Sequence, residues 1–181
     1  GLIEMPSAQS APDGMITSSI TGFGAQQRIN FNFQITPRLS GTFRYTHFEH
    51  IRDPASPELW DRSFDLKYQF ADEGIYMPAM AIGIQDFMGT GRLSAEYMVA
   101  TKTLRDDLRV SLGLGWGRFG TLNGFSNPLG VLSPSLRDRP TLDFGEGGTP
   151  HLGNYFRGDA ALFGGVEWRV APHFTLRAEY S

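Results

Sequence analysis

The fold is decided by the stretch from Arg62 to Gly120, in which residues 63–70 read SFDLKYQF and residues 108–117 read LRVSLGLGWG. In both runs a large apolar residue stands at every second position, and polar or small residues stand between them. Successive side chains of a β-strand point to opposite faces, so each run predicts a strand with one apolar face. Residues 79–85 and 93–100 alternate in the same way, with no helical pattern between the four runs.

The same alternation continues on both sides of this stretch. Residues 27–35 and 42–48 predict two strands joined by a tight proline turn, and residues 160–170 and 174–180 predict a second such pair near the end of the chain. A weaker strand is expected over residues 15–22. The chain therefore predicts about nine strands with period-two patterning.

The predicted connections alternate in length along the chain. Those at Pro37, 104–107 and 171–173 are short, whereas 50–61 and 119–157 are long, 71–77 is intermediate and 87–91 is shorter than the pattern requires. Short turns at one end and long loops at the other are typical of an outer-membrane barrel, whose short turns are periplasmic. A soluble sandwich gives no reason for this polarity.

Alternation alone also fits a soluble β-sandwich with one solvated face. Three features favour a membrane barrel. Several strands have the about 9–11 residues that a tilted crossing needs, the apolar faces are uncharged, and the opposite faces carry both signs of charge, which suits a polar interior with cross-strand ion pairs. The slightly negative mean hydropathy of -0.24 does not oppose this, because a barrel strand averages its two faces.

We therefore predict an all-β, antiparallel, up-and-down transmembrane β-barrel in the bacterial outer membrane. Residues 1–14 form an irregular lead-in, residues 15–181 form part of the barrel, and residues 119–157 form a long extracellular loop. Bacterial single-chain barrels have an even number of strands. Because an unpaired sheet edge cannot face lipid, we expect these strands to belong to a larger barrel in a longer chain.

Two groups of side chains follow from the alternation. Charged residues opposite the apolar faces are candidates for lining the lumen and contacting polysaccharide: Arg28, Arg44, Asp65, Lys67, Glu96, Arg109, Glu167, Arg169, Arg177 and Glu179. Aromatic residues near the strand ends are candidates for the interfacial girdles of a barrel, with Trp116 at the outer end and Trp168 at the inner end of its strand: Tyr45, Tyr68, Trp116, Trp168 and Tyr180.

The sequence gives weaker signals for a metal site, an anion site or a catalytic pair of carboxylates. His47 and His50 lie near Glu49, but alternation sends the two imidazoles to opposite faces, so no metal site is predicted. The glycine-rich segments 89–91 and 145–148 precede no helix that could bind an anion and are expected to be turns. Glutamates such as Glu96 could be imagined as glycosidase acids, but lumen ion pairs are the favoured interpretation.

Gly113, Gly115 and Gly117 form a small-residue stripe on the face opposite Leu112. Two interpretations stay open for it: close strand packing or a bend, and room for a chain or plug beside that wall.

Composition excludes several function classes. The net charge is -3 with mixed signs, so no clustered basic face for nucleic acid is indicated. The 181 residues contain no Cys, which excludes disulfide and thiolate-metal chemistry among them, and no apolar run approaches the roughly 18 residues of a membrane helix. No cofactor is predicted, and we expect that the protein is not an enzyme.

The motifs together resemble a known family. They are, in order, GLIEMPSA (1–8) with APDG (11–14), DRSFDLKY (61–68), PAMAIGIQD (78–86) with GTG (89–91), SAEYMVATK (94–102) and LGLGWGR (112–118). This series is similar to the YjbH-type family of outer-membrane exopolysaccharide biosynthesis proteins, relatives of a group 4 capsule protein. The resemblance implies an outer-membrane barrel in a chain several times longer, and it supplies no catalytic set.

Three functional hypotheses remain. The first is binding or passage of polysaccharide through a polar lumen, with the 119–157 loop as a gate. The second is a scaffold barrel that conducts nothing and assembles periplasmic exopolysaccharide proteins. The third is a soluble sandwich that binds or modifies polysaccharide. The expected partners are outer-membrane lipid, polysaccharide and periplasmic exopolysaccharide-assembly proteins, without nucleic acid.

Overall fold

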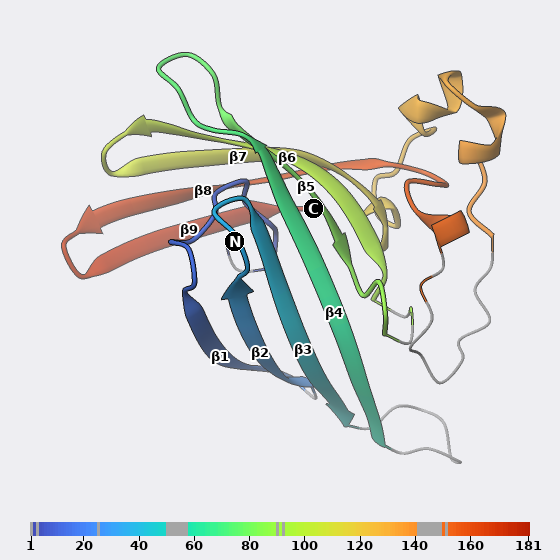
Figure 1. Cartoon of the computed structure of the whole chain (residues 1–181), viewed down its shortest axis with the longest axis horizontal. Helices are drawn as coiled ribbons and strands as arrows, with labels where there is room; N and C mark the ends of the chain where they lie inside the picture. Colours follow the sequence, from blue (N-terminus) through green and yellow to red (C-terminus); the bar gives the residue numbers. More distant parts are fainter. Residues whose placement is uncertain are drawn as a thin grey trace.

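Nine strands follow one another along the chain, and each pairs antiparallel with the next in a single curved sheet of order β1 to β9 (Figure 1). The computed structural model describes residues 2, 4–24, 26–49, 58–89, 91, 93–140, 150 and 152–181. The strands are β1 (Ile16–Phe23), β2 (Gln26–Gln34), β3 (Leu39–Glu49), β4 (Glu58–Ala71), β5 (Ala79–Gln85), β6 (Ala95–Arg105), β7 (Leu108–Gly117), β8 (Ala161–Ala171) and β9 (Phe174–Tyr180).

The prediction of an all-β, antiparallel, up-and-down arrangement with nine strands is confirmed. The sheet is not closed, because β1 and β9 form its two edges and do not pair with each other. The described residues form one sheet rather than the two packed sheets of a sandwich. The largest difference in length is at β4, which has 14 residues where the alternation of residues 63–70 predicted eight.

Connection lengths alternate from β3 onward as the sequence predicted, but the β1–β2 connection, residues 24–25, is short although it lies at the end of the long connections. Connections 35–38, 72–78, 106–107 and 172–173 lie at one end of the sheet, which we call the short-turn end. Connections 50–57, 86–94 and 118–160 lie at the other, the long-loop end. The longest connection holds four 3-10 helices: η1 (Arg118–Gly120), η2 (Pro128–Val131), η3 (Pro134–Leu136) and η4 (Leu152–Asn154).

One face of the sheet, which we call the inner face, carries the N-terminal segment. Its buried apolar residues form a small core made by Met5 and Ala8 of that segment together with residues of the sheet and of η1: Ala79, Ala81, Ala95, Tyr97, Val99, Phe119 and Phe163. Around this core the inner face is polar.

The glycine stripe on β7 is explained by this core. A Cβ on Gly113 would lie 2.2 Å from the Phe163 ring, and one on Gly115 would lie 2.5 Å from Phe119. On neighbouring β8, a Cβ on Gly165 would lie 2.4 Å from Leu2 of the N-terminal segment. Gly113 and Gly115 therefore make room for aromatic side chains of the core, and the chain segment lies beside Gly165, which the predicted stripe did not include.

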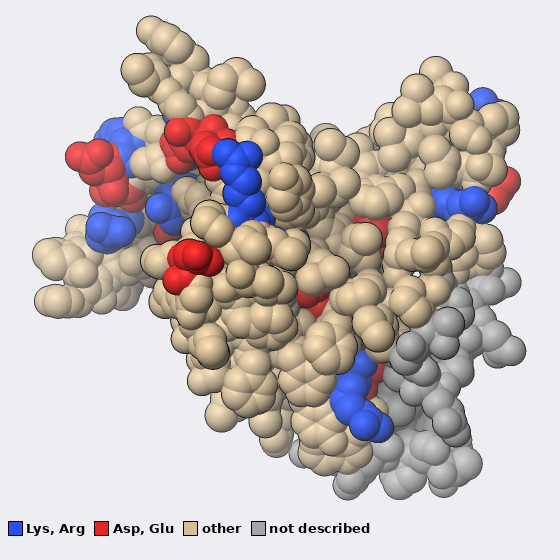
Figure 2. All heavy atoms as spheres, in the orientation of Figure 1, with Lys and Arg blue, Asp and Glu red and all other residues tan. Residues whose placement is uncertain are grey.

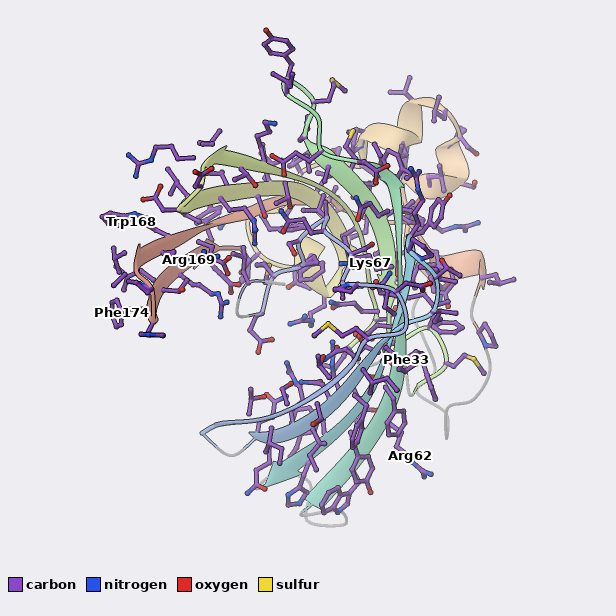
Figure 3. The ribbon with its side chains drawn as sticks, turned by 60° about the vertical axis from the view of Figure 1, so that its left-hand side comes forward. Phe33, Arg62, Lys67, Trp168, Arg169 and Phe174 are labelled. Carbon is purple, nitrogen blue, oxygen red and sulfur yellow. The ribbon has the colours of Figure 1, made fainter. Side chains whose placement is uncertain are left out.

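The opposite, outer face presents large apolar side chains to the surroundings. Phe31, Phe64, Leu112 and Leu162 are 39–60% exposed. Figure 3 shows Trp168 and Phe174 projecting from the sheet at the short-turn end. In the view of Figure 2, charged residues gather near the short-turn ends of β6 and β7, and much of the remaining surface is uncharged.

The expectation of wholly uncharged apolar faces needs a correction, because Arg62 of β4 and Glu96 and Lys102 of β6 lie on the outer face. Strand β4 begins earlier than predicted, so Arg62 lies on the outer face of β4 near the long-loop end and is exposed (Figure 3). No helix among the described residues is long and apolar enough to cross a membrane.

Candidate functional site

The N-terminal segment crosses the inner face of the sheet, and we call residues 4–11 the strap. Its backbone N–H groups donate hydrogen bonds to side chains from widely separated strands. The donors and acceptors are Met5 to Glu179 Oε1 of β9 (3.1 Å), Ala8 to Thr101 Oγ1 of β6 (2.9 Å), Ser10 to Gln69 Oε1 of β4 (2.8 Å) and Ala11 to Gln34 Oε1 of β2 (3.1 Å). The strap therefore bridges the sheet from β9 to β2 and satisfies its own backbone donors without joining the sheet.

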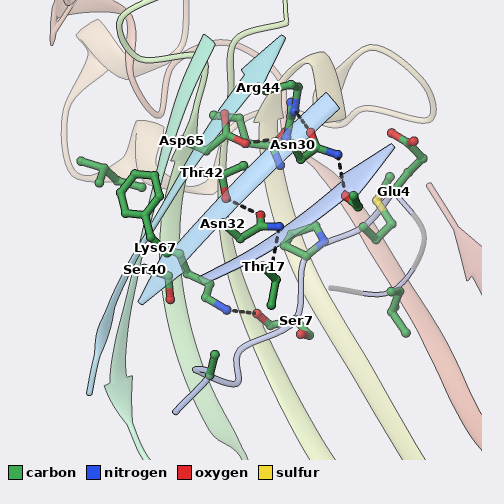
Figure 4. A pocket seen from close by; sticks show the side chains of 18 of the residues that line it. Glu4, Ser7, Thr17, Asn30, Asn32, Ser40, Thr42, Arg44, Asp65 and Lys67 are labelled. Carbon is green, nitrogen blue, oxygen red and sulfur yellow. Dashed lines mark hydrogen bonds and ion pairs between the residues drawn. The ribbon is translucent and has the colours of Figure 1, made fainter. Parts of the chain in front are cut away.

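Two cations of the inner face also hold the strap. Arg28 of β2 forms an ion pair with Glu4 at 2.9 Å. Lys67 of β4 donates from Nζ to the carbonyl oxygens of Ser7, at 3.2 Å, and of Gln9 (Figure 4). Lys67 thus satisfies carbonyl oxygens that the irregular strap leaves without a backbone partner, whereas Arg28 neutralises the Glu4 carboxylate.

Between the strap and strands β1 to β4 lies a polar pocket of about 410 Å³. Amide and hydroxyl side chains form a ladder along its wall, because polar residues of neighbouring antiparallel strands face one another in register (Figure 4). Thr42 donates to Asn32 Oδ1 at 2.9 Å, and Asn30 donates to Ser19 at 3.2 Å.

The charged residues of this pocket come from five places in the chain: the strap, β2, β3, β4 and η1. Arg44 of β3 and Asp65 of β4 form an ion pair in which both side chains are mostly buried. Asp65 also accepts the backbone N–H of Asp86 at 3.0 Å. Arg118, in η1, donates to Gln85 Oε1 at 3.3 Å and lies over the ring of Phe119 at 5.0 Å.

A second ion network lies on the inner face of β7, β8 and β9. Glu167 accepts from Arg109 at 3.0 Å and from Arg177 at 2.7 Å. The three residues are direct cross-strand neighbours in the register. Arg169 follows near the short-turn end, where it is exposed.

The structure places most of the predicted lumen residues on one face. The residues on the inner face are Arg28, Arg44, Asp65, Lys67, Arg109, Glu167, Arg169, Arg177 and Glu179. These nine divide between the pocket with the strap and the network around Glu167.

Glu96 is the correction to that set. It lies across from Trp116 and Ile84 on the outer face, and its side chain is fully buried. The sequence interpretation took the apolar residues of this strand as the outer set. The structure turns Tyr97 and Val99 toward the inner core, so Glu96 points the other way.

Glu96 and Trp116 instead hold the long loop 118–160 to the sheet. Arg139 forms a two-pronged pair with Glu96, at 2.7 and 2.9 Å, and the backbone N–H of Phe156 donates to the same carboxylate at 2.9 Å. Trp116 Nε1 donates to Asn127 Oδ1 at 2.9 Å, and Asn127 donates in turn to two loop carbonyl oxygens.

The girdle candidates divide in the same way. Tyr68 and Trp168 lie at the short-turn end of the outer face, where the Trp168 indole donates to Asp107 at 3.0 Å. Tyr45 and Tyr180 lie at the long-loop end; Tyr45 stacks on Trp60 at 5.1 Å, a partner the sequence interpretation had not included. Trp116 is fully buried beneath the loop, so it does not contribute to an exposed girdle.

Asp86 is another residue that the sequence interpretation missed. It is buried in the 86–94 connection, and its carboxylate accepts the backbone N–H of Leu93 at 3.0 Å. Burial and the negative charge of Asp61 raise the pKa of Asp86 to about 7. In the sequence, Asp86 reads only as the polar end of a strand.

Of the remaining sequence candidates, His47 lies on the outer face and stacks on Trp60 at 4.0 Å. His50 and residues 145–148 lie outside the described residues, as does Thr90 of the 89–91 segment. Within the described ranges, no group of three or more His, Cys, Asp or Glu side chains is arranged to hold a metal ion.

The fold and site define an all-β protein whose single up-and-down sheet separates an apolar face from a polar one that carries a strap and a pocket. The chain belongs to the YjbH family, described as "Exopolysaccharide biosynthesis protein YbjH", whose model matches residues 1–181. The resemblance seen in the sequence is thereby confirmed.

A relative in Escherichia coli (strain K12), the "Uncharacterized lipoprotein YjbH", is 33% identical over 188 residues. The match covers 99% of this chain and 26% of the relative, so the chain spans about a quarter of that protein's length. No solved structure matches the chain.

Proposed function

We propose that this chain is part of an outer-membrane β-barrel that binds or passes exopolysaccharide along its polar inner face. The observation that carries the proposal is the separation of the two faces of one sheet. Apolar side chains such as Leu112 are exposed on the outer face, whereas amides, hydroxyls and ion pairs line the inner one. This is the arrangement of a barrel with lipid outside and water inside.

Several further features support the membrane part of the proposal. Strands β3, β6 and β8 each have 11 residues, enough for a tilted crossing. Exposed aromatic residues lie toward both strand ends, and from β3 onward the connections are shorter at one end than at the other. The two unpaired edges would be completed by other strands of a longer protein.

Binding rather than catalysis is proposed for the inner face. Its carboxylates Asp65 and Glu167 each form an ion pair with arginine, which suits a structural role better than acid–base chemistry. Sugar hydroxyls both donate and accept hydrogen bonds, and the Asn and Thr side chains of the pocket offer both. Periplasmic exopolysaccharide-assembly proteins would meet the short-turn end.

The proposal can be tested by exopolysaccharide output. In cells that lack the native protein, full-length protein carrying Asn32→Leu should give several-fold less surface polysaccharide than the unaltered protein. Asn123→Gly, in the 118–160 loop outside the pocket, also removes an amide side chain at a position whose positive φ glycine accepts, and it serves as the control. Equal output from the pocket variant at equal membrane level would contradict a role for this face.

A scaffold barrel that conducts nothing is the second candidate, and the strap favours it because residues 4–11 occupy part of the inner face. Conductance of the full-length protein in planar bilayers separates the two. Open-channel currents support passage, whereas a silent barrel supports the scaffold. Gating by the 118–160 loop belongs to the passage proposal, and the Glu96–Arg139 pair would have to separate for the loop to lift from the sheet at Arg139.

A further inference from the structure

The pocket beneath the strap has an excess of positive charge. Among the described residues that line it, four are cationic, Arg28, Arg44, Lys67 and Arg118, and two are acidic, Glu4 and Asp65. The two carboxylates are already paired, with Arg28 and Arg44 respectively. Four positive and two negative side chains give the lining of the cavity a formal net charge of +2.

Arg118 is the cation with the weakest protein partner in this pocket. Its Nη2 group donates to the neutral amide of Gln85 at 3.3 Å, and it forms no ion pair with a described carboxylate. Its Nε atom is buried without a hydrogen-bond partner. Burial lowers the pKa of Arg118, and so does electrostatic repulsion from the positive guanidinium group of Arg44.

An anion in the cavity would relieve this arrangement. A guanidinium group binds a carboxylate with two parallel hydrogen bonds, and such charge-assisted bonds are stronger when partly buried. The amide and hydroxyl ladder of Asn30, Asn32 and Thr42 is available for uncharged hydroxyl groups on the same ligand. The cavity of about 410 Å³ lies in the size range of small-ligand pockets.

We propose that this pocket binds an acidic sugar unit of a polysaccharide, with the anionic group at Arg118 and the hydroxyl groups along the ladder. The inference rests on the proposed function, since it assigns a substrate class to the same inner face. A neutral glycan would leave the +2 charge of the pocket uncompensated. The pocket should therefore bind polysaccharide chains with anionic sugar units more tightly than neutral polysaccharide chains.

The test uses full-length protein in detergent and two probes of equal length and linkage. One is trigalacturonate, and the other is its carboxyl-reduced counterpart, which carries no charge. Titration calorimetry should show at least tenfold tighter binding of trigalacturonate. Arg118→Gln should reduce that preference to threefold or less, whereas Arg105→Gln, at the exposed end of β6, should leave it unchanged.

The outcomes separate the inference from the proposed function. Equal affinity for both probes overturns the acidic-sugar assignment and leaves polysaccharide binding intact. A preference that survives Arg118→Gln in folded protein also overturns it, because the anion would then bind elsewhere. Failure of both probes to bind overturns the assignment and removes support from the binding role. The comparison of probes on unaltered protein stands even if the variant does not fold.

Discussion

At the scale of single residues, the attachment of the 118–160 loop to the sheet depends on one buried carboxylate. Glu96 is fully buried, and it accepts from Arg139 and from the Phe156 backbone. A buried charge that loses its partner is much more costly than an exposed one, because water cannot replace the lost interaction.

Arg139→Ala should therefore lower the free energy of unfolding of the full-length protein by about 3–5 kcal/mol. Arg105→Ala is the matched control, because its ion pair with Asp107 is exposed and should contribute less than about 1 kcal/mol. Urea unfolding followed by tryptophan fluorescence measures both. A loss no greater for Arg139→Ala than for the control would show that the pair does not anchor the loop.

Asp86 predicts a dependence of stability on pH. Its pKa is about 7 in the folded protein because of burial and the charge of Asp61, whereas an unfolded Asp titrates near 3.9. Between these values the folded state holds a proton that the unfolded state has released. The stabilising contribution of Asp86 is therefore complete below about pH 4 and is lost as the pH rises through about 7.

Asp86→Asn should flatten this profile and raise stability at pH 8 by roughly 1–3 kcal/mol. The difference between variant and unaltered protein, measured from urea midpoints at pH 5 and pH 8, isolates this group from other titrations. Asp106→Asn, in the exposed β6–β7 turn, should leave the profile unchanged. A constant difference at the two pH values would refute the assignment.

At the scale of elements, strand β7 uses glycine to receive rings from its neighbours. Gly113 lies opposite Phe163 of β8, with room for the ring and none for a side chain. Gly113→Val should cost about 1–3 kcal/mol by overpacking, and Phe163→Ala about 3–5 kcal/mol by leaving a cavity.

Because the two changes act on the same space, the double variant should be more stable than the sum of the single losses predicts. Thermal unfolding of the full-length protein and the three variants measures the coupling. Strict additivity would mean that Phe163 does not occupy the space above Gly113.

At the scale of the whole molecule, the proposal places the outer face in lipid. Leu112 is 60% exposed in the middle of β7, and Leu122 is 66% exposed in the long loop. In water, arginine at either position should change stability little. In a membrane, Leu112→Arg should cost about 2–4 kcal/mol because charge enters the apolar band.

The free energy of unfolding of the two variants in lipid vesicles, measured by urea titration, distinguishes these cases. Leu122→Arg should behave as the unaltered protein does. If Leu112→Arg lost no stability in vesicles, that result would argue against lipid contact at the centre of the outer face.

The amino-acid sequence predicts the antiparallel sheet, its nine strands, most of the alternation in connection length and the face on which residues such as Lys67 and Glu167 lie. These are local properties, because side-chain direction in a strand has period two and turn residues act over a few positions. The family likeness followed from motifs spread along the same strands.

The three-dimensional arrangement was needed to find the path of the strap, the burial of Glu96 beneath the loop and the cation excess at Arg118. Each depends on contacts between segments far apart in sequence, where alternation carries no information. Glu96 shows the physical reason: Tyr97 finds an apolar partner in the inner core, so hydrophobic burial reverses the expected faces of β6.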